Sequence, residues 1–425
     1  MSEPEHINTT VNHLFRVESG KMVAVLVQIF GSEHLELCED VVQDALLRAL
    51  ETWKFRGMPD NPRAWLYRTA RNKAIDIIRK NKHSQTFDFS DPERALLSSE
   101  YTLATTVDQY WDEQHIQNDF LAMMYACCHP DISVEQQVTF ILKSLCGFST
   151  REVARAFLTN ESTISKRLYR TKEYFRKRAM RPRLPGKEAI SERTTAVLNA
   201  IYLLFNEGYN STHSEALVRE DLISQALFLC KSLLHNERTQ RPEVYALMAL
   251  MCFHAARSSS RTSTDGELIL LPQQDRGQWD HELISIGNNY LNKSAFGNQL
   301  STYHLEAAIA YQHCSAPDFD STNWTAIVDY YHALYKLSPS PVVHLNRALA
   351  ILEAQGPIAA MQQLQAISTE KSVQNYYLYH AALGEVHLRL KSTANAASCF
   401  QKALELTHSE LEKNHLRSKI AALVN

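Results

Sequence analysis

Hydrophobic residues recur along this chain mostly at intervals of three and four, the spacing that places side chains on one face of an α-helix. In the segment 35–53, Leu35, Val42, Leu46 and Leu50 fall on one such face. Runs in which Val, Ile or Thr alternate with polar residues are absent, and only 12 of the 425 residues are glycine. The pattern therefore predicts an all-α protein.

A second helix is predicted directly after the first. Gly57 and Pro59 break the first helix, and Asn61 then serves as an N-cap with Pro62 at the first helical position, where its missing N–H costs nothing. This helix continues to Arg79. Its predicted buried stripe consists of Leu66, Ala70, Ala74 and Ile77.

The same helix carries a second stripe, which is basic and aromatic. Cations hold a phosphate backbone, and an aromatic ring among them offers a surface on which an unpaired base can stack, worth roughly 1–3 kcal/mol per base. The alternative is that Trp65 packs in the core and the arginines are solvated. The stripe comprises Trp65, Arg68, Asn72, Asp76 and Arg79, with Arg71 alongside.

Residues 148–172 predict a helix-turn-helix. Ser149 and Glu152 form a capping box at the start of the first helix, with Phe148 and Val153 at the two staple positions. A turn at 159–161 precedes a second helix from Ser162 to Lys172, which would place its N-terminal residues in a major groove. An ordinary helix pair is the alternative. Small Ala154 is predicted at the helix crossing, Ile164 and Leu168 point inward, and Thr163, Lys166, Arg167 and Arg170 share the outward face.

Charge is segregated along the chain although the net charge is only −3. Residues 54–82 hold nine Lys/Arg and two Asp/Glu (+7), residues 83–142 one Arg and ten acids (−9), and residues 143–183 twelve Lys/Arg and three acids (+9). Clustered cations are the electrostatic footprint of a nucleic-acid binder. Two basic modules joined by an acidic segment indicate one nucleic acid contacted at two places.

The C-terminal half shows a helical repeat. Leu383-Gly384, Ala396, Phe400 and Ala403 occupy the small and aromatic positions of a tetratricopeptide-like unit, and Ala348, Ala360, Leu364 and Ile367 repeat the pattern 36 residues earlier, with Gly356-Pro357 at the turn. An earlier pair, 305–310 and 327–334, is separated by the insert 315–323. Such helix pairs share a core and leave a concave surface.

Several classes are disfavoured. The eight cysteines lack the spacing of a zinc site or a disulfide framework, and Cys127-Cys128-His129 is interpreted as buried thiols rather than a metal site. No nucleophile–base pair or phosphate-binding glycine loop is present, so we expect no enzyme, no metal and no cofactor. Neither a signal core nor a run of about 18 apolar residues occurs, so we expect a cytoplasmic protein without membrane contact.

Three polar clusters in the C-terminal half have two interpretations. A carboxylate–arginine network could bind a ligand, or Asp/Arg pairs could simply hold loops in place. The clusters are Asn206-Glu207-Gly208, Asp265-Gly266-Glu267 and Gln274-Asp275-Arg276.

Taken together, residues 8–180 resemble a sigma-70-type RNA polymerase sigma factor of the extracytoplasmic-function (ECF) class. The run Glu39 to Arg48 resembles the region 2 helix that docks on the clamp helices of the polymerase, and 55–79 resembles the part of region 2 that opens DNA and reads the −10 element. The helix-turn-helix resembles region 4, which reads the −35 element. Leu158 departs from the glycine that many such turns carry. Residues 197–209, 243–251 and 274–280 resemble the long extension of one sigma subgroup, which carries tetratricopeptide-like repeats.

The resemblance implies four segments: region 2 at 8–82, an acidic linker at 83–112, region 4 at 113–182 and a helical extension at 187–425. Core RNA polymerase and promoter DNA are the implied partners, and the extension is expected to pack on the sigma domains or on another protein. In the polymerase complex, the linker acids (Asp88, Asp91, Glu93, Asp108, Asp112 and Glu113) are expected to occupy positively charged channels.

The resemblance also implies roles for individual residues. Residues assigned to the −10 element are Phe55, Arg56, Asn61, Arg63, Trp65, Arg68, Arg71, Asn72 and Arg79. Those assigned to the −35 element are Thr163, Ser165, Lys166, Arg167 and Arg170, with Arg170 assigned to phosphate. Polymerase contacts are assigned to Asp40, Gln43, Asp44, Leu47 and Arg48.

Two other functions stay open from sequence. A repeat-containing DNA-binding regulator would use the helix-turn-helix without polymerase, although it would need neither the Trp65 helix nor the clamp-like helix. A scaffold that binds a peptide on its repeats would leave both basic segments solvated.

Overall fold

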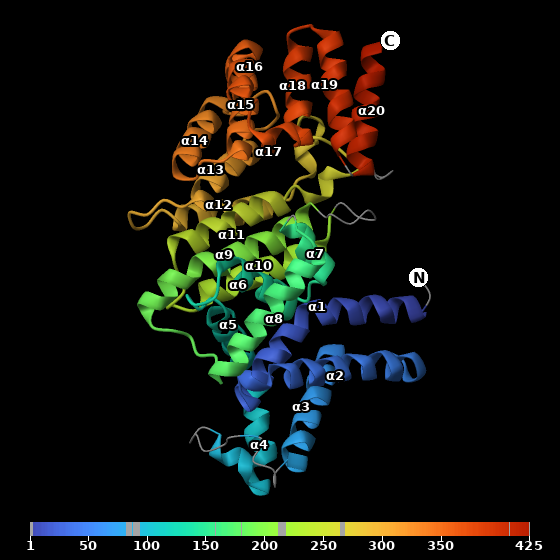
Figure 1. Ribbon diagram of the computed structural model, residues 1–425, viewed down its shortest axis with the longest axis vertical. Helices are drawn as coiled ribbons and strands as arrows, with labels where there is room; N and C mark the ends of the chain where they lie inside the picture. Colours follow the sequence, from blue (N-terminus) through green and yellow to red (C-terminus); the bar gives the residue numbers. More distant parts are fainter. Residues whose placement is uncertain are drawn as a thin grey trace. The chain divides into compact units, whose positions relative to one another are not determined.

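The described part of the chain is helical throughout (Figure 1). The structure is a computed structural model that describes residues 3–81, 87, 94–157, 159–179, 181–210, 218–263, 268–407 and 409–424. Within these ranges no β-strand occurs, and the one β-bridge joins Thr262 to Leu268. The prediction of an all-α fold is confirmed. Leu158, Asp88, Asp91, Glu93 and Asp265-Gly266-Glu267 lie outside the described residues.

The chain forms two compact units. Unit 1 comprises residues 1–204 and 224–239, and unit 2 comprises residues 205–223 and 240–425. The chain therefore passes between the units three times: within α9 (Lys187–Tyr209), within α10 (Glu220–His235), and between Thr239 and Gln240. The functional boundaries predicted at 82, 112 and 187 stay predictions.

Unit 1 is organised around its first helix. The second half of α1 is almost entirely buried, from Met22 to Phe30, and it contacts α2, α3, α4, α5 and the π-helical turn η3. The helices of this unit, besides α9 and α10, are α1 (Glu3–Phe30), α2 (Leu35–Arg56), α3 (Pro62–Asn81), α4 (Glu100–Tyr110), α5 (Glu113–Cys127), α6 (Val134–Phe140), η3 (Ile141–Leu145), α7 (Thr150–Ala156) and α8 (Glu161–Arg178), with short 3-10 turns η1 (Ser32–His34) and η2 (Ala95–Ser98).

Two glycines let α1 approach the segment 141–148 backbone to backbone. A Cβ atom at Gly20 would lie 2.0 Å from the carbonyl oxygen of Leu145, and one at Gly147, which has φ +69°, would lie 2.8 Å from Cα of Arg16. Only glycine fits such approaches without displacement. Helix α1 thus packs both on the predicted region 2 helices and on elements of predicted region 4.

The segment that follows predicted region 4 also packs into unit 1. Arg193 of α9 donates a hydrogen bond to the carbonyl of Tyr125 at 3.1 Å, and Gln225 of α10 donates one to the carbonyl of Arg16 at 2.9 Å. The ammonium group of Lys21 lies 4.7 Å from the ring centroid of Phe228. Part of the predicted extension is therefore integral to the core of unit 1.

Unit 2 is a succession of packed helix pairs, as seen for α18, α19 and α20 in Figure 1. The ring of Phe400 on α19 packs directly against Gly384 on α18. A Cβ atom at Gly384 would lie 2.4 Å from that ring, so only glycine allows the two helices to approach this closely. The further elements are α11 (Pro242–Ala255), η4 (Ser258–Arg261), η5 (Leu271–Gln273), η6 (Arg276–Gln278), α12 (His281–Lys293), α13 (Thr302–Ser315), α14 (Trp324–Leu337), α15 (Pro341–Gln355), α16 (Pro357–Ala366), α17 (Lys371–Gln374), α18 (Tyr377–Arg389), α19 (Thr393–Leu406) and α20 (Glu410–Val424).

The predicted repeat positions are buried in these pairs. Ala348, Ala360, Leu364 and Ile367 belong to one hydrophobic cluster that joins α15, α16 and α18. Gly356, with φ +92°, separates α15 from α16, and Pro357 begins the second helix of the pair. The pairing of helices agrees with the predicted repeat.

Three predicted core positions are only partly buried: Leu50, Ile77 and Leu168. On α3 the neighbours Ile75 and Ile78 are buried in place of Ile77, because α3 contacts α1, α2 and α4 and its buried face is broader than a single stripe. The second helix of the helix-turn-helix begins at Glu161 rather than at Ser162.

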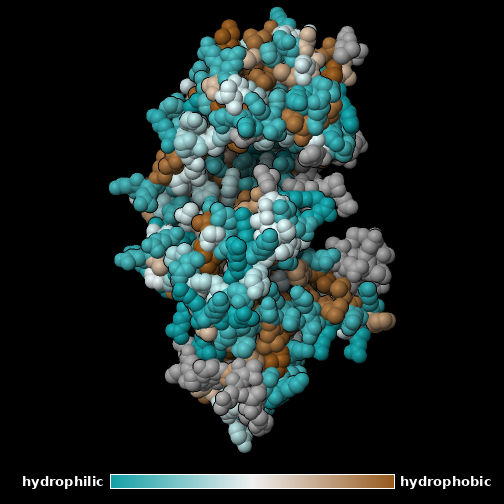
Figure 2. All heavy atoms as spheres, viewed as in Figure 1, coloured by the Kyte–Doolittle hydropathy of each residue, from teal (hydrophilic) through white to brown (hydrophobic). Residues whose placement is uncertain are grey.

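None of the helices in the described ranges combines the length and apolar character needed to cross a bilayer. On the face shown in Figure 2, hydrophilic residues predominate, and hydrophobic atoms form smaller groups, one of them over α1 and α2. The adjacent Cys127 and Cys128 are buried, and burial raises the pKa of the Cys128 thiol to about 12. The described residues contain no cluster of three or more metal-ligating side chains.

Candidate nucleic-acid interface

Helix α3 begins as its sequence predicts. The side-chain oxygen of Asn61 accepts a hydrogen bond from the backbone N–H of Ala64 at 3.0 Å, and Pro62 is the first residue of the helix. An N-cap of this kind satisfies one of the backbone donors that the first turn leaves free. The helix buries Leu66, Ala70 and Ala74 and leaves Arg68 and Asn72 exposed.

The burial of Trp65 is intermediate between the two alternatives, which were an exposed ring that stacks on a base and a ring packed in the core. Its indole is half-buried and meets the ring of Trp53 edge-on, with 5.5 Å between centroids and a 68° angle between planes. Trp53 is 1% exposed. The contact anchors one edge of Trp65 in the core and leaves part of its ring accessible. Its role in stacking on a base stays a prediction.

The connection between α2 and α3 presents an exposed aromatic ring. Phe55 is 90% exposed at the end of α2, next to exposed Arg56. Gly57 ends the helix at φ +76°, and nothing lies within 4 Å of the position its Cβ would take. A fully solvated Phe gains no hydrophobic stabilisation from the fold. This geometry leaves Phe55 free to contact a partner.

Three of the predicted DNA-contacting arginines on α3 are paired with carboxylates from residues 100–113. Arg71 donates hydrogen bonds to both carboxylate oxygens of Asp108, with Nη2 2.8 Å from Oδ2. Arg79 Nη2 lies 2.6 Å from Glu100 Oε1. Arg63 Nη2 lies 2.8 Å from Glu113 Oε2. Acidic residues on α4 and at the start of α5 therefore form ion pairs with three of the arginines that were predicted to contact DNA.

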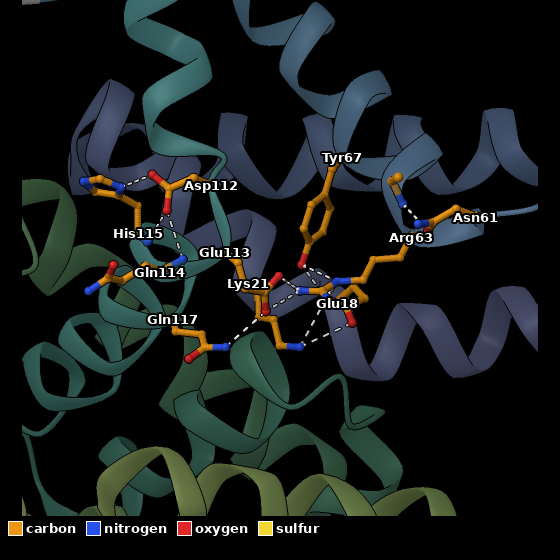
Figure 3. A network of polar contacts seen from close by, with 11 residues as sticks. Glu18, Lys21, Asn61, Arg63, Tyr67, Asp112, Glu113, Gln114, His115 and Gln117 are labelled. Atoms are coloured by element: carbon orange, nitrogen blue, oxygen red, sulfur yellow. Dashed lines mark hydrogen bonds and ion pairs between the residues drawn. The ribbon is translucent and has the colours of Figure 1, made fainter. Parts of the chain in front are cut away.

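Arg63 also belongs to a more buried polar network, shown in Figure 3. Glu18, which is buried on α1, accepts a hydrogen bond from the hydroxyl of Tyr67 at 2.5 Å and lies 3.2 Å from the ammonium of Lys21. Arg63 Nε is 3.4 Å from the same carboxylate. Burial, followed by the charge of Glu18, raises the pKa of Tyr67. This network fixes the first turn of α3 on α1.

The residues predicted to meet polymerase share one surface of α2. All of them are exposed, and Leu47 is 56% exposed although it is apolar. Asp44 is engaged within the chain, because its carboxylate lies 2.9 Å from the ammonium of Lys73 on α3. The exposed set is Asp40, Gln43, Asp44, Leu47 and Arg48.

Helices α7 and α8, which were predicted to form a helix-turn-helix, have the capping interactions that the sequence predicts. The hydroxyl of Ser149 accepts a hydrogen bond from the backbone of Glu152 at 3.2 Å, and Glu152 accepts one from the backbone of Ser149 at 2.7 Å, so both halves of the capping box are present. Phe148 and Val153 are fully buried. Asn160 caps α8 by accepting from the Thr163 backbone at 2.9 Å.

Residues predicted to read the −35 element divide into two groups. Ser165, Lys166 and Arg170 are exposed on α8. Thr163 is half-buried and donates from its hydroxyl to Asn160 at 2.9 Å. Arg167 is also half-buried, with its guanidinium 5.1 Å from the ring centroid of Phe157. These two side chains are therefore engaged within the motif itself, and the exposed Ser165 also donates its hydroxyl to the carbonyl of Glu161 at 2.9 Å.

Helix α8 packs against the predicted polymerase-binding helix α2, which sequence reasoning did not anticipate. Glu39 lies 2.6 Å from the ammonium of Lys172 and accepts a hydrogen bond from Ser144 at 3.1 Å. A cavity of about 370 Å³ beside this ion pair is lined by both Gln43 and Ser165. Residues predicted to meet polymerase and residues predicted to meet DNA thus face one space in this conformation.

The comparisons with known proteins agree with this geometry in the N-terminal part. Residues 14–84 match sigma-70 region 2, and residues 193–295 match a family of unknown function, DUF6596. A stretch of 161 residues is 26% identical to the ECF RNA polymerase sigma factor SigX of Bacillus subtilis (strain 168), over 37% of this chain and 79% of SigX. Together they support a sigma-70 family factor.

Similarity over nearly the full length is found with one further protein. The chain belongs to the same family as the uncharacterized protein R00370 of Rhizobium meliloti (strain 1021), to which it is 32% identical over 387 residues, 91% of this chain and 90% of the relative. The relationship includes both the sigma-like part and the C-terminal helices. No solved structure matches the chain.

Proposed function

We propose that this protein is an alternative sigma factor of the ECF class, which binds core RNA polymerase and directs promoter recognition and transcription initiation. The match of residues 14–84 to sigma-70 region 2 carries the proposal. It is supported by the exposed face of α2, which is available for a protein partner, and by the basic surface of α3 beside it. The protein would act without a cofactor, as a non-catalytic subunit.

In this proposal α3 and the 55–61 segment act on the −10 element. Phe55 and the accessible part of Trp65 would contact bases taken out of the stack, and Arg63, Arg68, Arg71 and Arg79 would contact backbone phosphates. Extruding a base costs a few kcal/mol, which stacking and phosphate contacts must offset.

Region 4 would read the −35 element through α8. Lys166 and Ser165, which are exposed near the helix N-terminus, would reach base edges, and Arg170 would contact phosphate. Arg167 would first have to leave the ring of Phe157, since a base contact requires its guanidinium free.

We further infer that the described conformation is a resting state. Acids of α4 and α5 neutralise Arg63, Arg71 and Arg79, and α8 packs on α2 through Glu39 and Lys172. Exposed ion pairs are each worth at most about 1 kcal/mol, so the phosphates of DNA can replace these carboxylates once polymerase draws the modules apart.

The C-terminal helix pairs are proposed to form a tetratricopeptide-like extension that modulates this activity. The helical pairing in α13 to α19 and the burial of the small repeat residues support that assignment. The extension would act through a protein partner or through the sigma domains.

In vitro transcription with core polymerase tests the proposal. The full-length chain should bind core polymerase and direct initiation at specific promoters selected from genomic fragments. A chain that binds duplex DNA but neither binds core polymerase nor supports initiation would instead be a helix-turn-helix regulator that acts alone. A chain that binds neither would be a scaffold.

A further inference from the structure

Three arginines and two histidines lie together in unit 2, in the region between α11 and α13. Arg257 and Arg276 are 8% and 7% exposed, and each guanidinium lies over the ring of Trp279, at 5.2 and 5.1 Å from its centroid. His254 of α11 and His313 of α13 are close enough to Arg257 to feel its charge. The third arginine is Arg261 of η4.

Among the described residues, the guanidinium groups of this cluster donate hydrogen bonds only to neutral acceptors, although the charge of the nearby Asp318 carboxylate reaches Arg276. Arg276 donates to the carbonyls of His313 and Ala316 at 2.6 and 2.8 Å and to the hydroxyl of Thr322 at 3.1 Å. Arg261 donates a hydrogen bond to the backbone carbonyl of Tyr209. Its guanidinium also stacks on the ring of Tyr209, 4.0 Å from the ring centroid. Among the residues that the structure describes, no carboxylate lies within ion-pair distance of Arg257, Arg261 or Arg276.

Arg257 is the least satisfied of the three. Its guanidinium makes no hydrogen bond to any described residue, and its Nε is buried without a partner. The indole N–H of Trp279 is likewise buried and unpaired, as are the hydroxyl of Ser260 and Nδ1 of both His254 and His313. Arginine and tryptophan are donors only. An acceptor is therefore the missing partner.

The cost of this arrangement is considerable. Arginine does not lose its proton in proteins, so burying its charge without a counter-charge is unfavourable. Stacking on an indole offsets part of that cost. Burial, followed by the charge of Arg257, lowers the pKa of His254 and of His313 to about 3, which keeps both imidazoles neutral. A bound anion would supply the negative charge and the hydrogen-bond acceptors that Arg257 lacks among the described residues.

We propose that Arg257, Arg276 and Trp279 form a binding site for a small oxyanion, a phosphate or carboxylate group of a metabolite. Arg257 is the principal ligand, because its Nε–H is buried without a partner among the described residues. Arg276 is held rigidly by three acceptors and supplies a fixed second charge. Neutral His254 and His313 and the hydroxyl of Ser260 complete the polar lining. Such a site would give the C-terminal half a small-molecule ligand, independent of any contact with DNA.

The interpretation that competes with this site is that the indole between the two guanidinium groups, with ordered water, is sufficient compensation. The two interpretations differ in what added anions do. Ligand binding to the folded state raises stability by an amount that saturates with concentration, whereas general ionic screening does not depend on one arginine.

The experiment is a titration of the full-length protein with inorganic phosphate, citrate and chloride at matched ionic strength, followed by NMR of ¹⁵N-labelled arginine Nε–H groups and by thermal unfolding. Phosphate, citrate or both should shift the Nε–H signal of Arg257 saturably and raise Tm, and chloride should do neither. Preference between phosphate and citrate then distinguishes the two ligand chemistries. Arg257→Gln should weaken binding at least about tenfold, while Arg389→Gln, at an exposed position of α18, should leave it unchanged.

Equal effects of all three salts, or shifts that persist unchanged in Arg257→Gln, would overturn the site. If Arg257→Gln does not fold, the wild-type NMR titration still decides, because it reports the Nε–H of Arg257 directly. An absence of any saturable shift there shows that Trp279 alone compensates the charge.

Discussion

Arg71 on α3 donates hydrogen bonds to both carboxylate oxygens of Asp108 on α4, and the Nη2–Oδ2 distance is 2.8 Å. The arginine was assigned to DNA and the aspartate to a linker, yet the chain pairs them with each other. Arg79 with Glu100 and Arg63 with Glu113 repeat the relationship along the same helix. If these arginines contact DNA as proposed, the acidic segment occupies the positions that phosphates would take.

Neutralising two of these acids should strengthen DNA binding. In the double variant Glu100→Gln/Asp108→Asn, Arg71 and Arg79 no longer have competing carboxylates, so affinity for a −10 single strand should rise about three- to tenfold. Fluorescence anisotropy at several salt concentrations measures it, and the dependence on salt should steepen. The double variant Asp320→Asn/Asp329→Asn, which removes two exposed acids of unit 2, serves as the charge-matched control. Equal affinities for both variants would contradict the proposed occlusion.

Gly20 is predicted to be essential for the packing of α1. Gly20→Ala places a methyl group 2.0 Å from the Leu145 carbonyl oxygen, so the two backbones must separate. Overpacking of this kind lowers the free energy of unfolding by about 1–3 kcal/mol. The higher helix propensity of alanine offsets up to about 1 kcal/mol of that loss. Urea unfolding should show the loss. Gly186→Ala is the control without a steric clash, because nothing lies within 4 Å of that position; Gly186 precedes α9 as its N-cap, so this variant should lose only about 1 kcal/mol or less.

Lys166 and Arg170 on α8 should differ in what they contribute to DNA binding. Lys166→Ala should relax discrimination at one base pair of the −35 element by about 1–3 kcal/mol. Arg170→Ala should weaken binding to all sequences alike and reduce the salt slope by roughly one. Competition binding with a set of single-base variants, made with the polymerase complex, separates the two. Identical profiles would remove the assignment of Lys166 to a base.

Replacing Phe55 or Trp65 should affect DNA opening and protein stability to different degrees. Phe55→Ala removes a ring that is 90% exposed, so stability should change by less than about 0.5 kcal/mol while open-complex formation declines. Trp65→Ala should impair opening as well, but it also removes the contact with Trp53 and should cost stability. Permanganate footprinting and thermal unfolding on the same variants measure both quantities. Normal opening by a well-folded Phe55→Ala protein would refute the role of that ring.

The stability of unit 2 should fall with acid. The pKa values of His254 and His313 are about 3 in the folded chain, below the ordinary value of 6.5, so the unfolded state binds more protons between these limits. Stability from these groups is complete above about pH 6.5 and is lost as pH falls toward 3, by up to about 1.4 kcal/mol per pH unit for each histidine.

Urea unfolding at pH 7, 6 and 5 measures this slope for the full-length chain. His254→Phe should reduce the slope, and exposed His281→Gln should not. A slope unaffected by His254→Phe would show that its imidazole is not the titrating group.

Local sequence signals predicted much of the helical structure. Asn61 and Ser149 cap their helices as expected, and Gly384 meets Phe400 at the predicted repeat contact. Such features depend on residues that are close in the sequence or at a fixed repeat spacing, so they can be predicted without knowing the tertiary structure. Ile77 was misassigned because which side of α3 is buried depends on three other helices.

Local patterns in the sequence were enough to predict a helical protein whose cations lie in two segments separated by acids, and residues 14–84 match sigma-70 region 2. The folded chain alone reveals where the acids go, that α8 packs on α2 through Glu39 and Lys172, and that Nε of Arg257 is buried without a partner among the described residues. The difference lies in sequence separation. Helix formation and capping are settled within a turn, whereas ion pairing and desolvation depend on residues 37 to 133 positions apart that meet only after the chain has folded.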